Sequence, residues 1–260
     1  MKTKLILQLI VIAFPLFVNA QTGDGTIKKT YNKAGGYSFN FGFGATQLNS
    51  GNLEALNTHL QKYNYALAPI QYSTWNLDVV HALYKNTVFN FGLTGLMKRN
   101  TVSDSSKTTM SGFAVNVDLG RVIYHANKLL IYPMVGARFG SSDFHSHYTG
   151  FNKASDISGT NSYRAIDFSF NIDYLTNGIG EKVDWSSSTP NLHPSGVLSL
   201  SVGYTFCPFN TYWNDNNYDI SSRFNSNINY PANVIGSVTP SNFSMFYVTL
   251  KFGMGLFSKQ

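Results

Sequence analysis

Apolar residues alternate with small or polar residues along eight segments of this chain, with a period of two. The clearest segment is 244–257, in which Phe246 and Leu250 lie on one parity while Thr249 and Lys251 lie on the other. Successive side chains of a strand point to opposite faces of a sheet, so each segment predicts a strand with one apolar and one polar face. The length of these segments suits a tilted strand that crosses a bilayer. The eight segments are 36–45, 70–84, 87–98, 110–124, 128–140, 164–175, 195–206 and 244–257.

The parity that faces lipid follows from the apolar residues in most of these segments. In segment 128–140 both parities carry apolar residues, and we expect the odd positions to face lipid because that choice sends Arg138 inward. In segment 70–84 one apolar face is expected along the whole length, formed by Trp75, Leu77, Val79 and Leu83.

The connections between the segments alternate between short and long, as in an up-and-down barrel. Residues 85–86 and 125–127 are short links. Residues 176–194 break the pattern, since they are too many for a tight turn. They form either a periplasmic flap or a missed pair of strands, which would make ten strands. The long connections, expected on the outer side, are 46–69, 99–109, 141–163 and 207–242.

A short helix is expected within the first long connection. Leu53, Leu56, Leu60 and Tyr63 recur there at the spacing of a helical face, and Asn49, Ser50 or Asn52 could cap its start. Such a helix would lie across the mouth of the barrel or pack on its rim.

The beginning of the chain has the features of an export signal. Residues 1–20 combine early lysines with an apolar run too short for a comfortable membrane helix, and small residues precede position 21. We therefore expect a cleaved signal peptide at 1–20, a flexible periplasmic lead-in at 21–35 and an outer-membrane barrel domain at 36–260.

Composition supports a barrel in lipid over a secreted β-sandwich, the rival fold. The chain has 20 Phe, 16 Tyr and 22 Gly in 260 residues, but only 12% charged residues. A soluble domain normally carries about 25%. The net charge of +6 is spread along the chain, which excludes a dense nucleic-acid footprint. The single cysteine, Cys207, excludes an intramolecular disulfide.

With the signal at 1–20, the repeated alternation and the closing strand Phe246 to Phe257, the chain resembles the small outer-membrane β-barrel proteins of Gram-negative bacteria, the OmpA/OmpX-type and related porin-like families. The resemblance implies an all-β, antiparallel transmembrane barrel in the bacterial outer membrane. It implies membrane lipids and the barrel-assembly machinery as partners. The chain departs from these families at its end: their last strand ends in an aromatic residue, whereas here Phe257 is followed by three more residues. It does not assign a function, since these families include adhesins, channels, enzymes and structural proteins.

The polar parity of the predicted strands gathers charged residues in the lumen. An eight-stranded barrel is just wide enough for side chains to fill. Opposite charges inside it must pair, which indicates a structural plug; a narrow channel lined by the same groups is the alternative. The expected lumen network comprises Asp78, Asp118, Arg138, Asp167, Asp173 and Lys251.

Two further groups of residues are candidates for function. The last long connection is rich in Asn, Ser and aromatic residues, a composition suited to binding an extracellular ligand that the sequence does not identify. Its contact candidates are Tyr212, Trp213, Tyr218 and Tyr230.

The second group comprises Ser141, Asp143, His145, Ser146 and His147, whose residue types suit a metal site or a lipid-modifying enzyme. No catalytic motif supplies a third oriented group, so a polar loop tip is the expected interpretation. We expect a non-enzymatic protein without metal or cofactor, acting through its surface loops or as structural support.

Overall fold

The computed structural model describes residues 34–49, 53–62, 64–103, 106–126, 128–148, 156–182, 193–209, 211–215 and 240–259. The expected signal peptide and nearly all of the expected lead-in lie outside these described residues. Within the described ranges, no helix has the length and apolar character needed to cross a membrane.

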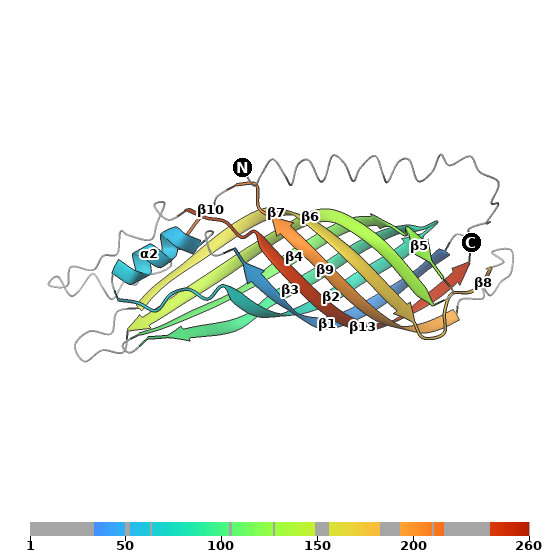
Figure 1. Ribbon diagram of the computed structural model, residues 1–260, viewed down its shortest axis with the longest axis horizontal. Helices are drawn as coiled ribbons and strands as arrows, with labels where there is room; N and C mark the ends of the chain where they lie inside the picture. The colour runs from blue at the N-terminus through green and yellow to red at the C-terminus, as the bar shows by residue number, and fades with distance from the viewer. Residues whose placement is uncertain are drawn as a thin grey trace. The chain divides into compact units, whose positions relative to one another are not determined.

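Eight long strands form one closed antiparallel barrel (Figure 1). Each pairs with its neighbour in the chain, and the last strand pairs with the first along its whole length, from Ala34 opposite Lys259 to Leu48 opposite Met245. The prediction of eight strands is therefore confirmed and the ten-stranded alternative is wrong. The strands are β1 (Ala34–Leu48), β2 (Gln71–Tyr84), β3 (Thr87–Val102), β4 (Ser106–Arg121), β6 (Leu129–Tyr148), β7 (Asp156–Leu175), β9 (His193–Phe206) and β13 (Met245–Lys259).

Short elements decorate the two ends of the barrel, which we call the turn end and the loop end. At the turn end are β5 (Tyr124–His125) and β8 (Gly180–Lys182), and β8 pairs in parallel with the end of β13. At the loop end are α2 (Glu54–Lys62), β10 (Thr211–Tyr212), β11 (Asn214–Asp215) and β12 (Pro240–Ser241).

The turn end is closed by tight connections. Lys85 and Asn86 join β2 to β3 with φ angles of 48° and 68°, both in the left-handed region. Two such central residues define a type I′ turn, whose twist matches that of the strands it joins. The described part of the long connection after β7 is an ordered flap. Asn177 donates its backbone N–H to Ser195 Oγ at 3.1 Å, and Ile179 is buried.

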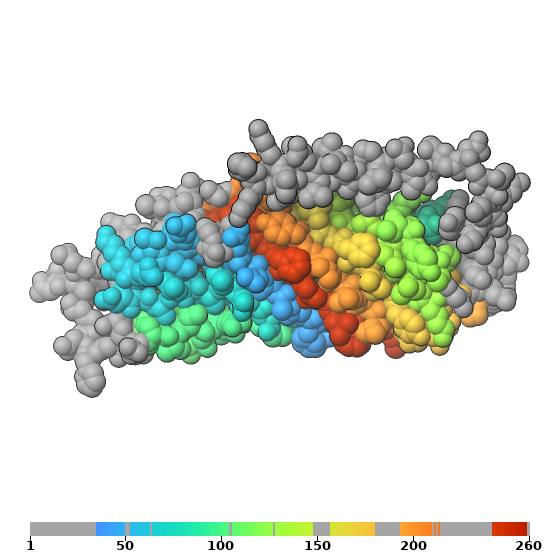
Figure 2. Space-filling view, in the orientation of Figure 1, coloured from blue at the N-terminus to red at the C-terminus, as the bar shows by residue number. Residues whose placement is uncertain are grey.

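The outward side chains form an apolar belt around the barrel. On β13 they are Phe246, Val248, Leu250, Phe252 and Met254, of which Met254 is 76% exposed. Figure 2 shows this face, on which the outward side chains of β1, β13, β9 and β7 lie side by side over tilted strands. Exposed apolar side chains on one parity of successive strands are what a lipid-facing wall requires. The expected parity of 128–140 is also confirmed, because Val135 and Phe139 are exposed whereas Arg138 is buried.

A β-bulge in β2 corrects one predicted face. The register of β2 shifts between Asp78 and Val80 against β3, so Val79 and Val80 are both exposed. One extra residue in a strand reverses the parity of every residue after it. Leu83, which the alternation placed against lipid, is therefore turned inward and is buried, and His81 lies on the inward face with it.

The strands at the loop end are longer than the sequence predicts. β6 and β7 pair from Leu129 opposite Tyr174 up to His147 opposite Asp156. Most of the expected loop 141–163 is thus a strand hairpin, and β3 and β4 likewise continue to Val102 and Ser106. Alternation of apolar and polar residues ends where the belt ends, so it cannot reveal strands that continue into water.

The belt makes a prediction for Leu250→Arg, which puts a charge at the middle of the apolar face of β13. We expect the free energy of folding into lipid vesicles to fall by about 2–4 kcal/mol. Gln47→Arg, on the outward face of β1 opposite Phe246 at the loop-end edge of the belt, is the control and should change it by roughly 0–1 kcal/mol. The measurement is denaturant unfolding in vesicles, and equal costs for the two variants would contradict the belt.

Candidate functional site

The inward side chains of the barrel form three layers. Along β6, Leu130 and Tyr132 lie nearest the turn end, Arg138 lies in the middle and Phe144 lies nearest the loop end. We call these layers the turn-end cluster, the polar band and the loop-end cluster, in their order from the turn end to the loop end. The candidate site is therefore a polar band between two apolar layers.

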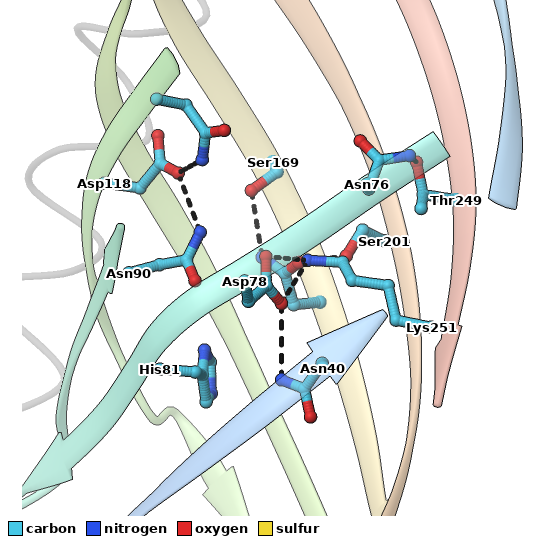
Figure 3. A network of polar contacts seen from close by, with 12 residues as sticks. Asn40, Asn76, Asp78, His81, Asn90, Asp118, Ser169, Ser201, Thr249 and Lys251 are labelled. Atoms are coloured by element: carbon cyan, nitrogen blue, oxygen red, sulfur yellow. Dashed lines mark hydrogen bonds and ion pairs between the residues drawn. The ribbon is translucent and has the colours of Figure 1, made fainter. Parts of the chain in front are cut away.

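Two ion pairs lie in the polar band, one between the neighbouring strands β6 and β7 and one between β13 and β2, which flank β1. Lys251 Nζ of β13 lies 2.8 Å from Asp78 Oδ2 of β2, and Asn40 of β1 donates to the same carboxylate at 3.3 Å (Figure 3). Arg138 of β6 lies 3.3 Å from Asp167 Oδ1 of β7, and its guanidinium stacks over the Tyr247 ring at 4.9 Å. The structure thus places four of the predicted lumen residues in two ion pairs.

Tyrosine hydroxyls donate hydrogen bonds to two of the carboxylates. Tyr247 donates to Asp167 at 2.5 Å, and Tyr132 donates to Asp173 at 2.6 Å. His81 Nε2 lies 3.4 Å from Asp173 Oδ2. A charge buried in a medium of low dielectric is stable only when it is paired and hydrogen-bonded. These contacts therefore fix the inward side chains of strands that are distant along the sheet.

Asp118 of β4 is held differently from the other three carboxylates. It accepts hydrogen bonds from Asn116 at 2.6 Å and from Asn90 at 3.2 Å. The inward face opposite it is kept clear by Gly136, where a Cβ atom would collide with Asp118 Oδ1 and with the carbonyl of Val117. The described residues thus leave space for this carboxylate and give it two amide donors.

The loop-end cluster is a hydrophobic core above the polar band. Leu53, Leu56 and Leu60 of the α2 segment are fully buried in it, as the helical spacing predicts. Trp213 packs edge-on against Phe144, with ring centroids 4.9 Å apart, and donates its indole N–H to Ser241 Oγ at 2.7 Å. The expected helix therefore closes the mouth of the barrel.

The turn-end cluster closes the opposite end of the lumen. Leu83, Leu130, Leu175, Ile179 and Phe257 are among its buried members. The bulge in β2 and the ordered flap after β7 bring Leu83 and Ile179 into it. Apolar side chains thus occupy the inward positions where the sequence pattern leads one to expect polar groups.

Little empty space remains between these layers. A cavity of about 30 Å³ lies in the polar band, and a second cavity of about 10 Å³ lies towards the loop-end cluster. A water molecule needs at least ~10–15 Å³ measured in this way, so the larger cavity holds one or two. Among the described residues, these two cavities are far too small to form a continuous aqueous path.

A closed eight-stranded barrel with an apolar outer belt and a filled polar lumen is now established by the geometry. The chain has the fold of the small outer-membrane β-barrel proteins. The resemblance noted in the sequence is thereby confirmed at the level of the fold.

Three solved structures are similar to this barrel. The first is Ail, the attachment invasion locus protein of Yersinia pestis, in complex with a heparin analogue; it has 11% sequence identity and a TM-score of 0.39, and the match covers 86% of this chain and 98% of that chain. The second is Neisserial surface protein A, with 12% identity, a TM-score of 0.36 and coverage of 85% of this chain and 96% of that chain. The third is the outer membrane protein OprG of Pseudomonas aeruginosa, with 9% identity, a TM-score of 0.41 and coverage of 88% of this chain and 98% of that chain. No protein-family model and no curated protein sequence matches the chain. Similarities this distant do not assign a role to the barrel.

The expected contact residues of the last connection are not brought together on a described surface. Trp213 is a buried core residue, so its prediction as a surface contact is wrong. Tyr212 lies on β10, which pairs with β12. Tyr218 and Tyr230 lie outside the described residues. An aromatic residue in a polar loop is as well suited to anchoring that loop as to binding a ligand, and the sequence does not distinguish the two.

The group around His145 lies on a strand of the barrel and not on a loop tip. Ser146 points inward and is hydrogen-bonded to Thr108 at 2.8 Å, while Asp143 points outward and accepts from Thr160 at 2.6 Å. His145 is exposed on the same outward face as Asp143. Among the described residues no group of three or more His, Cys, Asp or Glu side chains could hold a metal ion.

Sequence reasoning missed the partners that complete the polar band. Tyr132, Tyr247 and His81 contact the lumen carboxylates, although Tyr and His also suit the membrane interface and the rim. A signal was present for two of them: Tyr132 shares the inward parity of Arg138, and Tyr247 shares that of Lys251. His81 gave no such signal, because the bulge sets its direction.

Lys251→Met tests the ion pair with Asp78, since it leaves a buried carboxylate without its cation. We expect a loss of about 3–5 kcal/mol in folding free energy, measured by denaturant unfolding in micelles. Adding Asp78→Asn to the same chain should recover most of that loss, because the uncompensated charge is then removed. Lys107→Met at the exposed loop end is the control, with a change within roughly 0.5 kcal/mol. A loss that the second substitution does not reduce would contradict the pairing.

Proposed function

We propose that this protein is an integral protein of a bacterial outer membrane whose barrel is a closed scaffold, and that its role is non-enzymatic. Its apolar belt would rest in lipid, and its loop end would stand outside the cell. The observation that carries this proposal is the sealing of the lumen by an apolar cluster at each end of the polar band. A barrel that is closed in this way offers partners its outer surfaces and no passage.

The surfaces that remain available lie at the loop end. There, β3, β4, β6 and β7 continue beyond the belt as a sheet made of two hairpins. Its outward residues are polar, such as Ser111, Asp143 and His145. Pairing of β3 with β2 ends at Leu96, whereas β3 itself continues to Val102. Ordering strands that extend into water costs conformational entropy, and no lipid-facing surface is gained in return. We therefore infer that these strands present a rigid surface for interaction.

The alternative function, a narrow channel for small solutes, is disfavoured by the same packing. An ion would have to displace both apolar clusters and break the pairs Lys251–Asp78 and Arg138–Asp167. A lipid-modifying enzyme is not supported either, since Ser146 is turned into the barrel while His145 is turned out of it.

Planar-bilayer recording tests the closed scaffold. The purified barrel inserted into a lipid bilayer should show no stepwise conductance at moderate voltage, because the two apolar clusters would block an aqueous path through the lumen. A porin inserted under the same conditions serves as the positive control. Sustained, uniform conductance steps that depend on the presence of this protein would contradict a closed lumen.

Labelling of single cysteines in intact cells tests the proposed orientation. Val102→Cys, at a loop-end position that is 75% exposed, should react with a membrane-impermeant maleimide, whereas Lys85→Cys in the turn should not. The natural Cys207 gives no background, since burial raises the pKa of its thiol to about 11. Reaction of the Lys85→Cys variant after cell lysis shows that its thiol is competent. The reverse labelling pattern in intact cells would overturn the orientation.

A further inference from the structure

An open cavity of about 480 Å³ lies on the outward face of β4, β6 and β7, and we call it the outer-wall cavity. Pockets that hold small organic ligands have volumes of roughly 300–1,000 Å³. The strand register explains the hollow: Phe113 lies opposite Ser141, Ser141 lies opposite Ser162, and Phe139 lies opposite Arg164. Two adjacent serines are thus flanked by three large side chains, which leaves the space above the serines unfilled.

The outer-wall cavity lies where the apolar belt ends. Towards the turn end, the next outward residues of β4 and β7 are apolar, Val115 and Ile166. Towards the loop end, the next outward residues of the three strands are polar, Ser111, Asp143 and Thr160. The cavity therefore spans the level at which the acyl chains of a lipid leaflet meet its headgroups.

The lining of the cavity is divided in the same way. Phe113 and Phe139, which are 43% and 51% exposed, give it an apolar side. Arg164 and the hydroxyls of Ser141 and Ser162 give it a polar side with hydrogen-bond donors. Among the described residues, no ion pair joins Arg164 to a carboxylate. A cation beside hydroxyl donors fits an anion, and the planar guanidinium matches the oxygens of a phosphate group.

The acidic residue of β6 is too far away to oppose an anion at Arg164. Asp143 does not line the cavity, and its carboxylate accepts a hydrogen bond from Thr160 of β7 at 2.6 Å. Arg164 lies opposite Phe139, four residues before Asp143 on β6, which corresponds to about 13 Å at the rise of a strand. The positive charge of Arg164 therefore dominates the polar side of the cavity.

We propose that the outer-wall cavity binds one membrane lipid of the leaflet at the loop end, through a phosphate group on its headgroup. Arg164 and the two serine hydroxyls hold the phosphate, and an acyl chain lies across Phe113 and Phe139. A soluble phosphate would leave the aromatic rings uncovered, and a neutral lipid would leave the guanidinium without an anion. The site goes beyond the proposed function, because it lies on the outer wall and is the same whether the lumen is closed or conducts.

The test measures lipid binding to the folded protein in micelles of a neutral detergent, by titration and native mass spectrometry. The probes share two myristoyl chains. Phosphatidic acid has an exposed phosphate, phosphatidylcholine covers its phosphate with a choline cation, and diacylglycerol has no phosphate. One phosphatidic acid should bind per barrel, with a Kd roughly tenfold or more below that of the other two lipids, because only its phosphate is free to pair with a guanidinium. Inorganic phosphate at the same concentration should not displace it.

Three outward-facing variants locate the site. Arg164→Gln removes the cation, and Ser141→Leu fills the cavity while leaving the cation in place. Each should raise the Kd for phosphatidic acid by roughly tenfold or more, and either one suffices if the other does not fold. Arg121→Gln is the matched control, because Arg121 is an exposed arginine on the outward face of β4 at the turn end. It should leave the Kd within about twofold.

Three results would overturn the proposal. Equal affinities for phosphatidic acid and diacylglycerol would show that the phosphate is not recognised. Displacement of the lipid by inorganic phosphate would show a site for a free anion and not for a lipid. An equal loss of affinity in Arg164→Gln and Arg121→Gln would show that positive charge at either interface attracts the lipid without a defined site.

Discussion

The structure depends on one constraint: within hydrocarbon, every backbone N–H and C=O must find a partner in the protein itself. A sheet of eight strands satisfies this only by closing on itself, which here joins β1 to β13 over fifteen residue pairs, from Ala34 opposite Lys259 to Leu48 opposite Met245. Once the sheet is closed, each of the two alternating sets of side chains has a fixed environment. One parity must face lipid, and the other must fill a lumen that is only as wide as its side chains.

The three layers of the lumen follow from filling that narrow space. Polar groups at the centre are stable only in contact with one another. The polar band provides these contacts through ion pairs, tyrosine hydroxyls and asparagine amides. At the ends water could enter, and there a cluster of apolar side chains fills the lumen at each end. α2 and Trp213 cover one end, while Phe257 and the flap after β7 cover the other. The barrel is therefore a scaffold with two hydrophobic cores and a polar core between them.

The sequence predicts the membrane-crossing part of this fold well, because lipid on one side and a polar lumen on the other impose a strict period of two. Its failures occur where that contrast is absent. The bulge at Val79 and Val80 is invisible, since two adjacent valines fit either parity. The continuation of β6 and β7 into water carries no apolar face. Trp213 was misread because burial against Phe144 and Ser241 arises from contacts distant in sequence. In the lumen, the six charged residues could be predicted from parity, but their pairing and the isolation of Asp118 depend on the stagger of the strands.

Closure between β1 and β13 is the claim on which the rest stands, and amide hydrogen exchange in lipid nanodiscs measures it directly. If the barrel is closed, the amides of β1 and β13 that pair across this seam, such as those near Phe41 and Phe252, will exchange as slowly as those between β3 and β4. Rapid exchange confined to the seam, with β3 and β4 protected, would show an open sheet and contradict the account.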